Sequence, residues 1–127
     1  MRKGSVRETH ALAMSLADYA EIARGKGDMD VAEELLHRAY YYESQAARLV
    51  AGNLDAEPTR STLHRSAASL ALQCGAYDEA ERLIIAGLSG IPPEDIDAEL
   101  RELLREVKKQ KGGKNDALLS QARKRST

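Results

Sequence analysis

A pattern of small residues occurs twice in this chain, and the two copies lie 48 residues apart. In each copy, small residues at helical spacing stand on both sides of a glycine. The first copy comprises Ala20, Ala23, Gly27, Met29, Ala32, Leu36 and Ala39, and the second comprises Ala68, Ala71, Gly75, Tyr77, Ala80, Ile84 and Gly87. Because small side chains let two helices pack closely on either side of a glycine turn, each copy predicts an antiparallel helical hairpin. Repeated hairpins are typical of binding proteins rather than enzymes.

The spacing of apolar residues predicts five helices and no strand. The expected helices cover about residues 6–24, 29–50, 59–74, 78–88 and 92–110. The last one begins at Pro92 and Pro93, which suit a first helical turn, and its acidic first turn faces the positive end of the helix. Its apolar residues form a single stripe, which predicts a helix that caps the second hairpin. The fold class is therefore all-α.

Charge is divided unevenly along the chain, although the net charge is only −1. Residues 1–7 carry +3, residues 107–127 carry +6, and the stretch between them carries −10. A break is expected at residues 111–114, where two glycines lie between two lysines. The sequence thus predicts one domain over residues 1–110 and a basic, flexible tail over residues 111–127.

The basic tail leaves two kinds of partner open. It could contact nucleic acid or an acidic protein. The acidic body would repel phosphate, and the tail has no aromatic residue on which a base could stack. We therefore expect the partner to be another protein or a peptide. A regulatory role in a nucleic-acid-linked or toxin-type system, with the tail engaging the target, is the alternative.

Residues with potential chemistry do not form a recognisable active site. Glu34 and His37 have the Glu-x-x-His spacing of di-iron bundles, but such sites need a second pair and two more carboxylates. His10 and His64 have no Cys or His at zinc-ligand spacing. Cys74 lacks a nucleophile motif, and neither a Gly-x-Ser-x-Gly motif nor a phosphate-binding loop is present. We expect no enzymatic activity, no metal and no cofactor.

Composition indicates a cytoplasmic protein without membrane contact. The chain contains no run of 18 apolar residues, and its basic start is not followed by the apolar core of a secretory signal. The single Cys74 cannot form an internal disulfide, which fits a reduced thiol in the cytosol. The core lacks Trp and Phe, and alanine contacts bury little area. Self-association is therefore a plausible additional source of stability, and a homo-oligomer is possible.

The second unit resembles a tetratricopeptide repeat (TPR). The resemblance rests on Gly75-Ala76-Tyr77-Asp78-Glu79-Ala80, on Ile84, Gly87-Leu88 and Pro92, and on Ala68 in the preceding helix. The first unit shares the glycine, Met29 and the small residues but has no closing proline. The resemblance covers about residues 13–92. It implies two hairpins and a capping helix, stacked either as an α-α superhelix or as a compact five-helix array.

Two departures from the TPR pattern affect this expectation. The period is 48 residues rather than about 34, because the second helix is long and a loop follows it. The aromatic residue that the family places in the first helix is replaced by Ala23 and Ala71.

The resemblance also implies where a partner docks, because the first helix of each TPR-like hairpin faces a concave groove. Carried over residue by residue, this groove is lined by Met14, Ala17, Glu21, Arg24, Thr62, Arg65, Ser69, Leu72 and Gln73. Some family members grip a C-terminal carboxylate with Lys, Arg and Asn. The first unit has Ala17, Asp18 and Glu21 at those positions, so that clamp is not expected. We expect a small adaptor or scaffold that binds a peptide or a helix.

Three consecutive tyrosines, Tyr40, Tyr41 and Tyr42, leave two interpretations open. Three successive residues cover most of the circumference of a helix, so at least one ring lies outside the core. The rings either cover the long second helix where it meets the third, or an exposed pair forms part of an interface.

Overall fold

The computed structural model describes the backbone of residues 5–125 and the side chains of residues 5–113. Its five helices are α1 (Val6–Gly25), α2 (Met29–Val50), α3 (Thr59–Gln73), α4 (Tyr77–Leu88) and α5 (Glu94–Arg125). No residue between 5 and 125 forms a strand, so the predicted all-α class is confirmed. Residues 1–4 and 126–127, which include two of the basic N-terminal residues, lie outside the described part.

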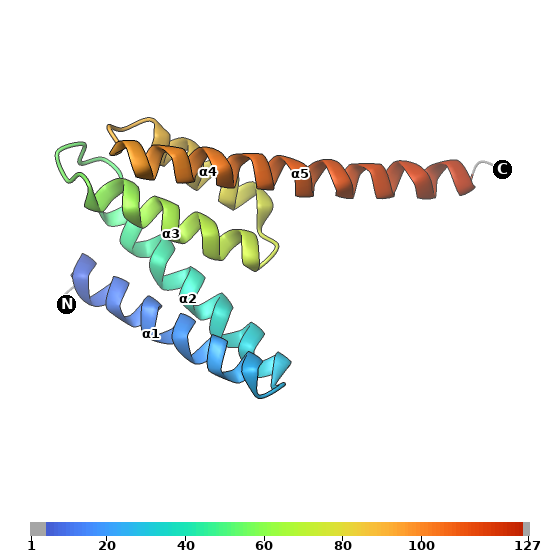
Figure 1. The fold of residues 1–127 in the computed structure, drawn as a ribbon, viewed down its shortest axis with the longest axis horizontal. Coiled ribbons are helices and arrows are strands. Elements are labelled where there is room, and N and C mark those ends of the chain that lie inside the picture. Colours follow the sequence, from blue (N-terminus) through green and yellow to red (C-terminus); the bar gives the residue numbers. More distant parts are fainter. Residues whose placement is uncertain (1–4, 126–127) are drawn as a thin grey trace.

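The helices form two hairpins, α1 with α2 and α3 with α4 (Figure 1). Both turns contain the predicted glycine in the left-handed conformation, with φ of +83° at Gly27 and +77° at Gly75. In both turns, the residue after the glycine donates its backbone N–H to the carbonyl five residues earlier, at 2.9 Å. This hydrogen bond satisfies a carbonyl that the end of the helix would otherwise leave free. The two predicted hairpins and their turns are confirmed.

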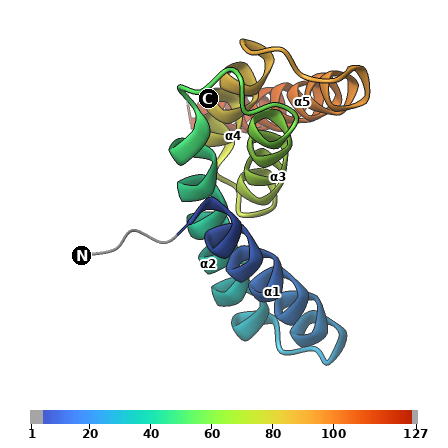
Figure 2. The same cartoon turned by 90° about the vertical axis from the view of Figure 1, so that its left-hand side faces the viewer.

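The helices pack mainly against their neighbours in the sequence. α2 packs against both α1 and α3, and α5 packs against α3 and α4. Figure 2 shows that one part of α2 lies beside α1 while its other end reaches the unit formed by α3, α4 and α5. α2 therefore connects the two hairpins, and α5 covers the second hairpin as the sequence predicts for a capping helix.

Alanine dominates the contacts between the helices. Within residues 5–113, the alanines with no exposed surface are Ala13, Ala39, Ala46, Ala47, Ala67, Ala68, Ala71 and Ala80. The closest approach is at Gly87 of α4. A Cβ atom added there would lie 3.1 Å from His64 Cβ on α3 and 3.1 Å from Leu100 Cδ1 on α5. Three helices meet at this point with almost no space for a side chain on α4.

A buried arginine connects the ends of two helices. The side chain of Arg60, at the start of α3, is 3% exposed. Its Nε donates to the carbonyl of Ala51 after α2, and its Nη2 donates to the carbonyl of Ala86 near the end of α4, both at 2.8 Å. Such bonds satisfy helix-end carbonyls and lower the cost of burying the charge.

The structure differs from the sequence prediction on one side of α1. The spacing of Leu12, Leu16, Tyr19, Ala20 and Ala23 predicts an apolar stripe on this helix, yet Leu12 and Tyr19 are 43% and 60% exposed. The buried side of α1 is formed by Ala13, Ala20 and Ala23. Because α1 stands at the end of the array and packs chiefly against α2, part of its apolar stripe has no helix over it.

A second difference concerns the end of α5. The break predicted at residues 111–114 is absent, and the backbone stays helical through Gly112 and Gly113 to Arg125. Each glycine costs only about 1 kcal/mol relative to alanine inside a helix. Lys111 Nζ also holds this part of α5 to α4, at 2.8 Å from Asp78 Oδ1 and 3.6 Å from Glu81 Oε2. Beyond this contact, α5 extends past the rest of the molecule (Figure 1).

Candidate functional site

Helices α1, α3 and α5 border a groove of about 520 Å³. It is lined by Met14 and Ala17 from α1, by Arg65, Ser66, Ser69, Leu70 and Gln73 from α3, and by Glu99, Glu102 and Leu103 from α5. The three helices are the first helices of the two hairpins and the capping helix. The groove therefore lies on the side of the array where the TPR resemblance places a partner.

The groove contains five of the nine residues selected from the sequence: Met14, Ala17, Arg65, Ser69 and Gln73. All five come from the middle of α1 and from one face of α3.

The other four selected residues lie elsewhere. Glu21 and Arg24 are exposed on α1, with Oε1 and Nη1 3.7 Å apart. Arg24 instead lines a smaller pocket with Gln73, Cys74 and residues of α2. Thr62 is half-buried on α3 and does not line the groove. Leu72 packs against the core cluster around Ile84, because it is one position from Gln73 and one position turns a helix by about 100°.

The contribution of α5 to the groove was not predicted. Glu99 Oε2 lies 2.5 Å from Arg65 Nη1, so an ion pair joins α5 to α3 beside the groove. Glu99 and Leu103 are four residues apart on the predicted capping helix, which places them on one face. That spacing was visible in the sequence, but the resemblance was carried over only to the first helices of the two hairpins.

A buried carboxylate adjoins the groove from α2. The side chain of Glu43 is completely buried, and its two oxygens lie 2.8 and 2.9 Å from His10 Nδ1 on α1. Burial raises the pKa of Glu43, while His10, a hydrogen bond with Ser66 and the charge of Arg65 oppose that rise. Ser66 and Arg65 line the groove, so the charge of Glu43 acts on two residues of the groove wall. No sequence motif pointed to Glu43.

Two further titratable groups that are shielded from solvent, Cys74 and His64, favour their neutral forms. Burial raises the pKa of the Cys74 thiol to about 11, and the charge of Glu33 adds to this rise. The thiol is therefore protonated at neutral pH and is a poor nucleophile. Burial lowers the pKa of His64, whose Nδ1 donates to the backbone carbonyl of Arg60 at 2.7 Å. His64 is a hydrogen-bonded packing residue between α3 and its neighbours.

The Glu-x-x-His pair on α2 is engaged in surface ion pairs. Glu34 Oε1 lies 3.0 Å from Arg38 Nη2, and His37 Nε2 lies 3.9 Å from Glu33 Oε1. Among the residues with described side chains, no three His, Cys, Asp or Glu are placed to hold a metal ion.

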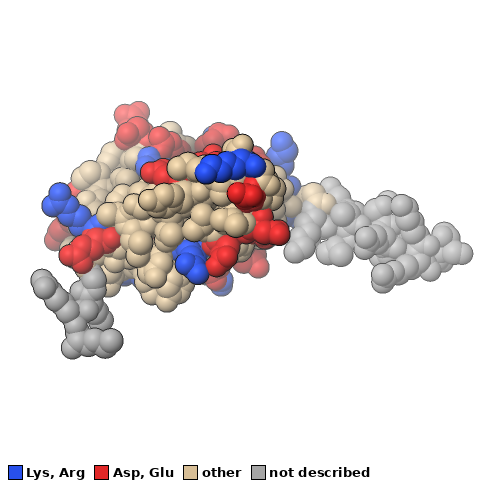
Figure 3. Space-filling model, turned by 90° about the horizontal axis from the view of Figure 1, so that it is seen from below, with Lys and Arg blue, Asp and Glu red and all other residues tan. Residues whose placement is uncertain are grey.

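The surface of the body carries much acidic charge. On the face that Figure 3 shows, acidic side chains lie around much of the edge and uncharged side chains cover the middle. In the part of the chain that the structure describes, none of the helices has the length and apolarity needed to cross a membrane. Comparison with known proteins found no protein-family model, no curated protein and no solved structure that matches this chain.

Proposed function

We propose that this protein is a non-enzymatic binding module, a small TPR-like adaptor or scaffold, that holds a peptide or helix of a partner protein in the groove between α1, α3 and α5. The observation that carries the proposal is the groove itself. Apolar Met14, Leu70 and Leu103 stand beside polar and charged side chains from α3 and α5. Mixed surfaces of this kind suit an amphipathic segment of another protein.

Recognition in this groove depends on side chains. The walls are α-helices, whose backbone N–H and C=O groups already bond to each other. A partner therefore cannot add a strand to them, and its affinity must come from apolar burial and from contacts with polar groups. Burying one Leu-sized side chain against Met14, Leu70 and Leu103 is worth about 1.5–3 kcal/mol. Ser69, Gln73 and the Arg65–Glu99 pair are placed to orient the segment.

The TPR-like part of the proposal is supported by the repeat. Both hairpins turn at a left-handed glycine with the same backbone hydrogen bond. Both also pack through alanines at corresponding positions, such as Ala32 and Ala80, which are 4% and 0% exposed. The longer period follows from the 22 residues of α2 and from the loop before α3.

A peptide-display selection against the purified protein tests this function. Selected peptides should lose at least about tenfold in affinity for Ser69→Arg, which fills the groove with a long side chain. Ser15→Arg is the matched control, because Ser15 is exposed on α1 and outside the groove. Selected peptides that bind Ser69→Arg as tightly as the unmodified protein would place the binding surface elsewhere and contradict the proposal.

A further inference from the structure

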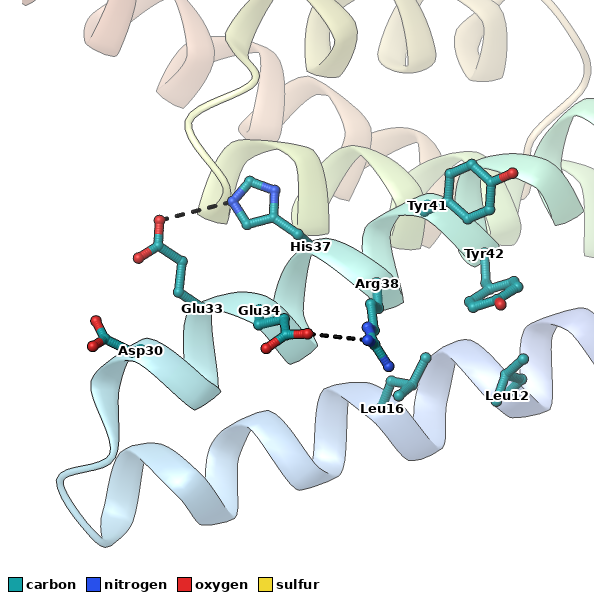
Figure 4. A pocket seen from close by; sticks show the side chains of 9 residues that line it. All are labelled: Leu12, Leu16, Asp30, Glu33, Glu34, His37, Arg38, Tyr41 and Tyr42. Atoms are coloured by element: carbon teal, nitrogen blue, oxygen red, sulfur yellow. Dashed lines mark hydrogen bonds and ion pairs between the residues drawn. The ribbon is translucent and has the colours of Figure 1, made fainter.

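The α1–α2 hairpin carries a second surface that shares no residue with the groove. Its pocket of about 700 Å³ is lined by Leu12 and Leu16 from α1 and by Asp30, Glu33, Glu34, His37, Arg38, Tyr41 and Tyr42 from α2. We call these nine residues the tyrosine surface. In Figure 4, Tyr42 points toward the part of α1 that carries Leu12 and Leu16, and the acidic residues lie farther along α2.

The three tyrosines divide between the core and this surface. Tyr40 packs against two core clusters, whereas Tyr41 is 56% exposed and Tyr42 is half-buried. The rings of Tyr41 and Tyr42 meet edge to face with their centroids 5.3 Å apart. Gln45 Nε2 also donates to the Tyr41 hydroxyl at 3.0 Å. Exposed aromatic rings that are held in place, next to an exposed Leu12, are typical of an interaction surface.

The internal repeat indicates what kind of structure covers such a surface. A shift of 48 residues relates three residues of α1 to three residues of α3, namely Leu12, Leu16 and Tyr19 to Arg60, His64 and Ala67. The α3 residues are at most 3% exposed, and Ala67 packs against Ala46, Ala47 and Val50 of α2. In the second hairpin Ala67 therefore packs against the preceding helix α2, whereas Arg60 also bonds to Ala86 of α4 and His64 lies against Gly87 of α4. The corresponding residues Leu12 and Tyr19 of the first hairpin are exposed, so this side of α1 is open to a helix.

A candidate helix projects from the other end of the molecule. Residues 111–125 continue α5 as a helix, which at 1.5 Å per residue is about 22 Å long. The segment contains Leu118 and Leu119, five Lys or Arg residues in all, and a single acidic residue. A helix of this length with two glycines is marginal in water on its own, so packing against another surface stabilises it.

The tyrosine surface complements this segment in charge and in length. It has three carboxylates and one guanidinium, and it extends about 18 Å along α2 from Asp30 to Tyr42. Because α5 runs along the second hairpin and extends away from α1 (Figure 1), a contact between the two joins separate copies of the chain.

We propose that residues 111–125 of one copy dock as a helix on the tyrosine surface of a second copy. Basic residues of the segment meet Asp30, Glu33 and Glu34, and its leucines add apolar area beside the tyrosines. The contact is heterologous, so copies joined by it form a reciprocal pair or an open chain.

Sedimentation velocity of the full chain tests this contact. We expect association that increases with protein concentration and weakens between about 50 mM and about 500 mM NaCl, because salt screens the opposite charges. Two variants remove the charge complementarity. Glu33→Lys with Glu34→Lys changes the tyrosine surface, and Arg123→Glu with Lys124→Glu and Arg125→Glu changes the docking segment of α5. Each variant alone should associate at least about tenfold more weakly than the unmodified chain. An equimolar mixture of the two should associate again, because both contacts between unlike copies pair opposite charges.

The control variant is Asp18→Lys with Asp55→Lys, which makes the same change in charge as Glu33→Lys with Glu34→Lys but at exposed positions outside the tyrosine surface. It should associate like the unmodified chain, and far-ultraviolet circular dichroism should show equal helicity for all variants. A chain that stays monomeric at low salt would overturn the proposal. Association that the α5 substitutions do not weaken would also overturn it, because residues 111–125 would then not take part in the contact, as when two tyrosine surfaces meet face to face. So would a mixture that fails to associate.

Discussion

Replacing Gly87 with alanine should destabilise the protein, although the same change inside an ordinary helix is stabilising. Alanine gains about 1 kcal/mol over glycine in a helix interior. At Gly87 the new Cβ would lie 3.1 Å from His64 Cβ and 3.1 Å from Leu100 Cδ1. His64 Cβ is attached directly to the backbone of α3, and Leu100 is completely buried. His64 Cβ cannot move aside without shifting α3, and the buried Leu100 can turn away only by repacking against its neighbours.

Overpacking of a closed contact costs about 1–3 kcal/mol. This cost exceeds the gain in helix propensity, so Gly87→Ala should lower the free energy of unfolding by about 1 kcal/mol. For a chain of this size, that corresponds to a decrease of roughly 4 °C in the melting temperature. Gly87→Val adds two more methyl groups and should cost more than Gly87→Ala.

Urea unfolding followed by circular dichroism measures this difference. Gly25→Ala is the control, because Gly25 is the last residue of α1 and a Cβ there would have no atom within 4 Å. That variant should be as stable as the unmodified chain or slightly more stable. If Gly87→Ala were equally stable, the three helices would have room to separate, and the argument from close packing would be wrong.

Four further predictions concern the repeat and the buried titratable groups. Ala80→Leu should lower the free energy of unfolding by roughly 1–3 kcal/mol, measured in urea, because Ala80 has no exposed surface in the second hairpin. Gly75→Val should cost about 1–3 kcal/mol in the same assay, since a β-branched residue is strained at a φ of +77°. Burial lowers the pKa of His64, so the unfolded chain binds more protons below pH 6.5 and stability falls as the pH drops through that region; His64→Gln should reduce this fall. Burial raises the pKa of Glu43, so stability falls as the pH rises from about 4.5 through the raised value; Glu43→Gln should gain stability relative to the unmodified chain over that range.

Local signals in the sequence predicted the helices well. The turns at Gly27 and Gly75 depend on a conformation that glycine adopts easily, and the helices around them follow from the spacing of their apolar residues. The same local reasoning failed at Gly112 and Gly113. There the propensity cost is small, and the contact of Lys111 with α4 is tertiary and has no sequence signature.

The candidate groove was only partly predictable for a similar reason. The pattern on α3 identified Arg65, Ser69 and Gln73, because their helical spacing fixes which face they share. It did not show how far the groove extends along α1, where Met14 and Ala17 line it and Glu21 does not. Leu12 shows the same limit, because an apolar stripe indicates which face favours burial and not whether another helix covers it.

The shared helix α2 has a consequence for how the protein unfolds. Because the backbone hydrogen bonds of α2 run without interruption from its contact with α1 to its contact with α3, the first hairpin cannot melt without fraying a helix that packs against the second. Repeat arrays whose units are joined only by loops can lose one unit at a time. This chain should instead unfold in a single cooperative step, with equal calorimetric and van't Hoff enthalpies.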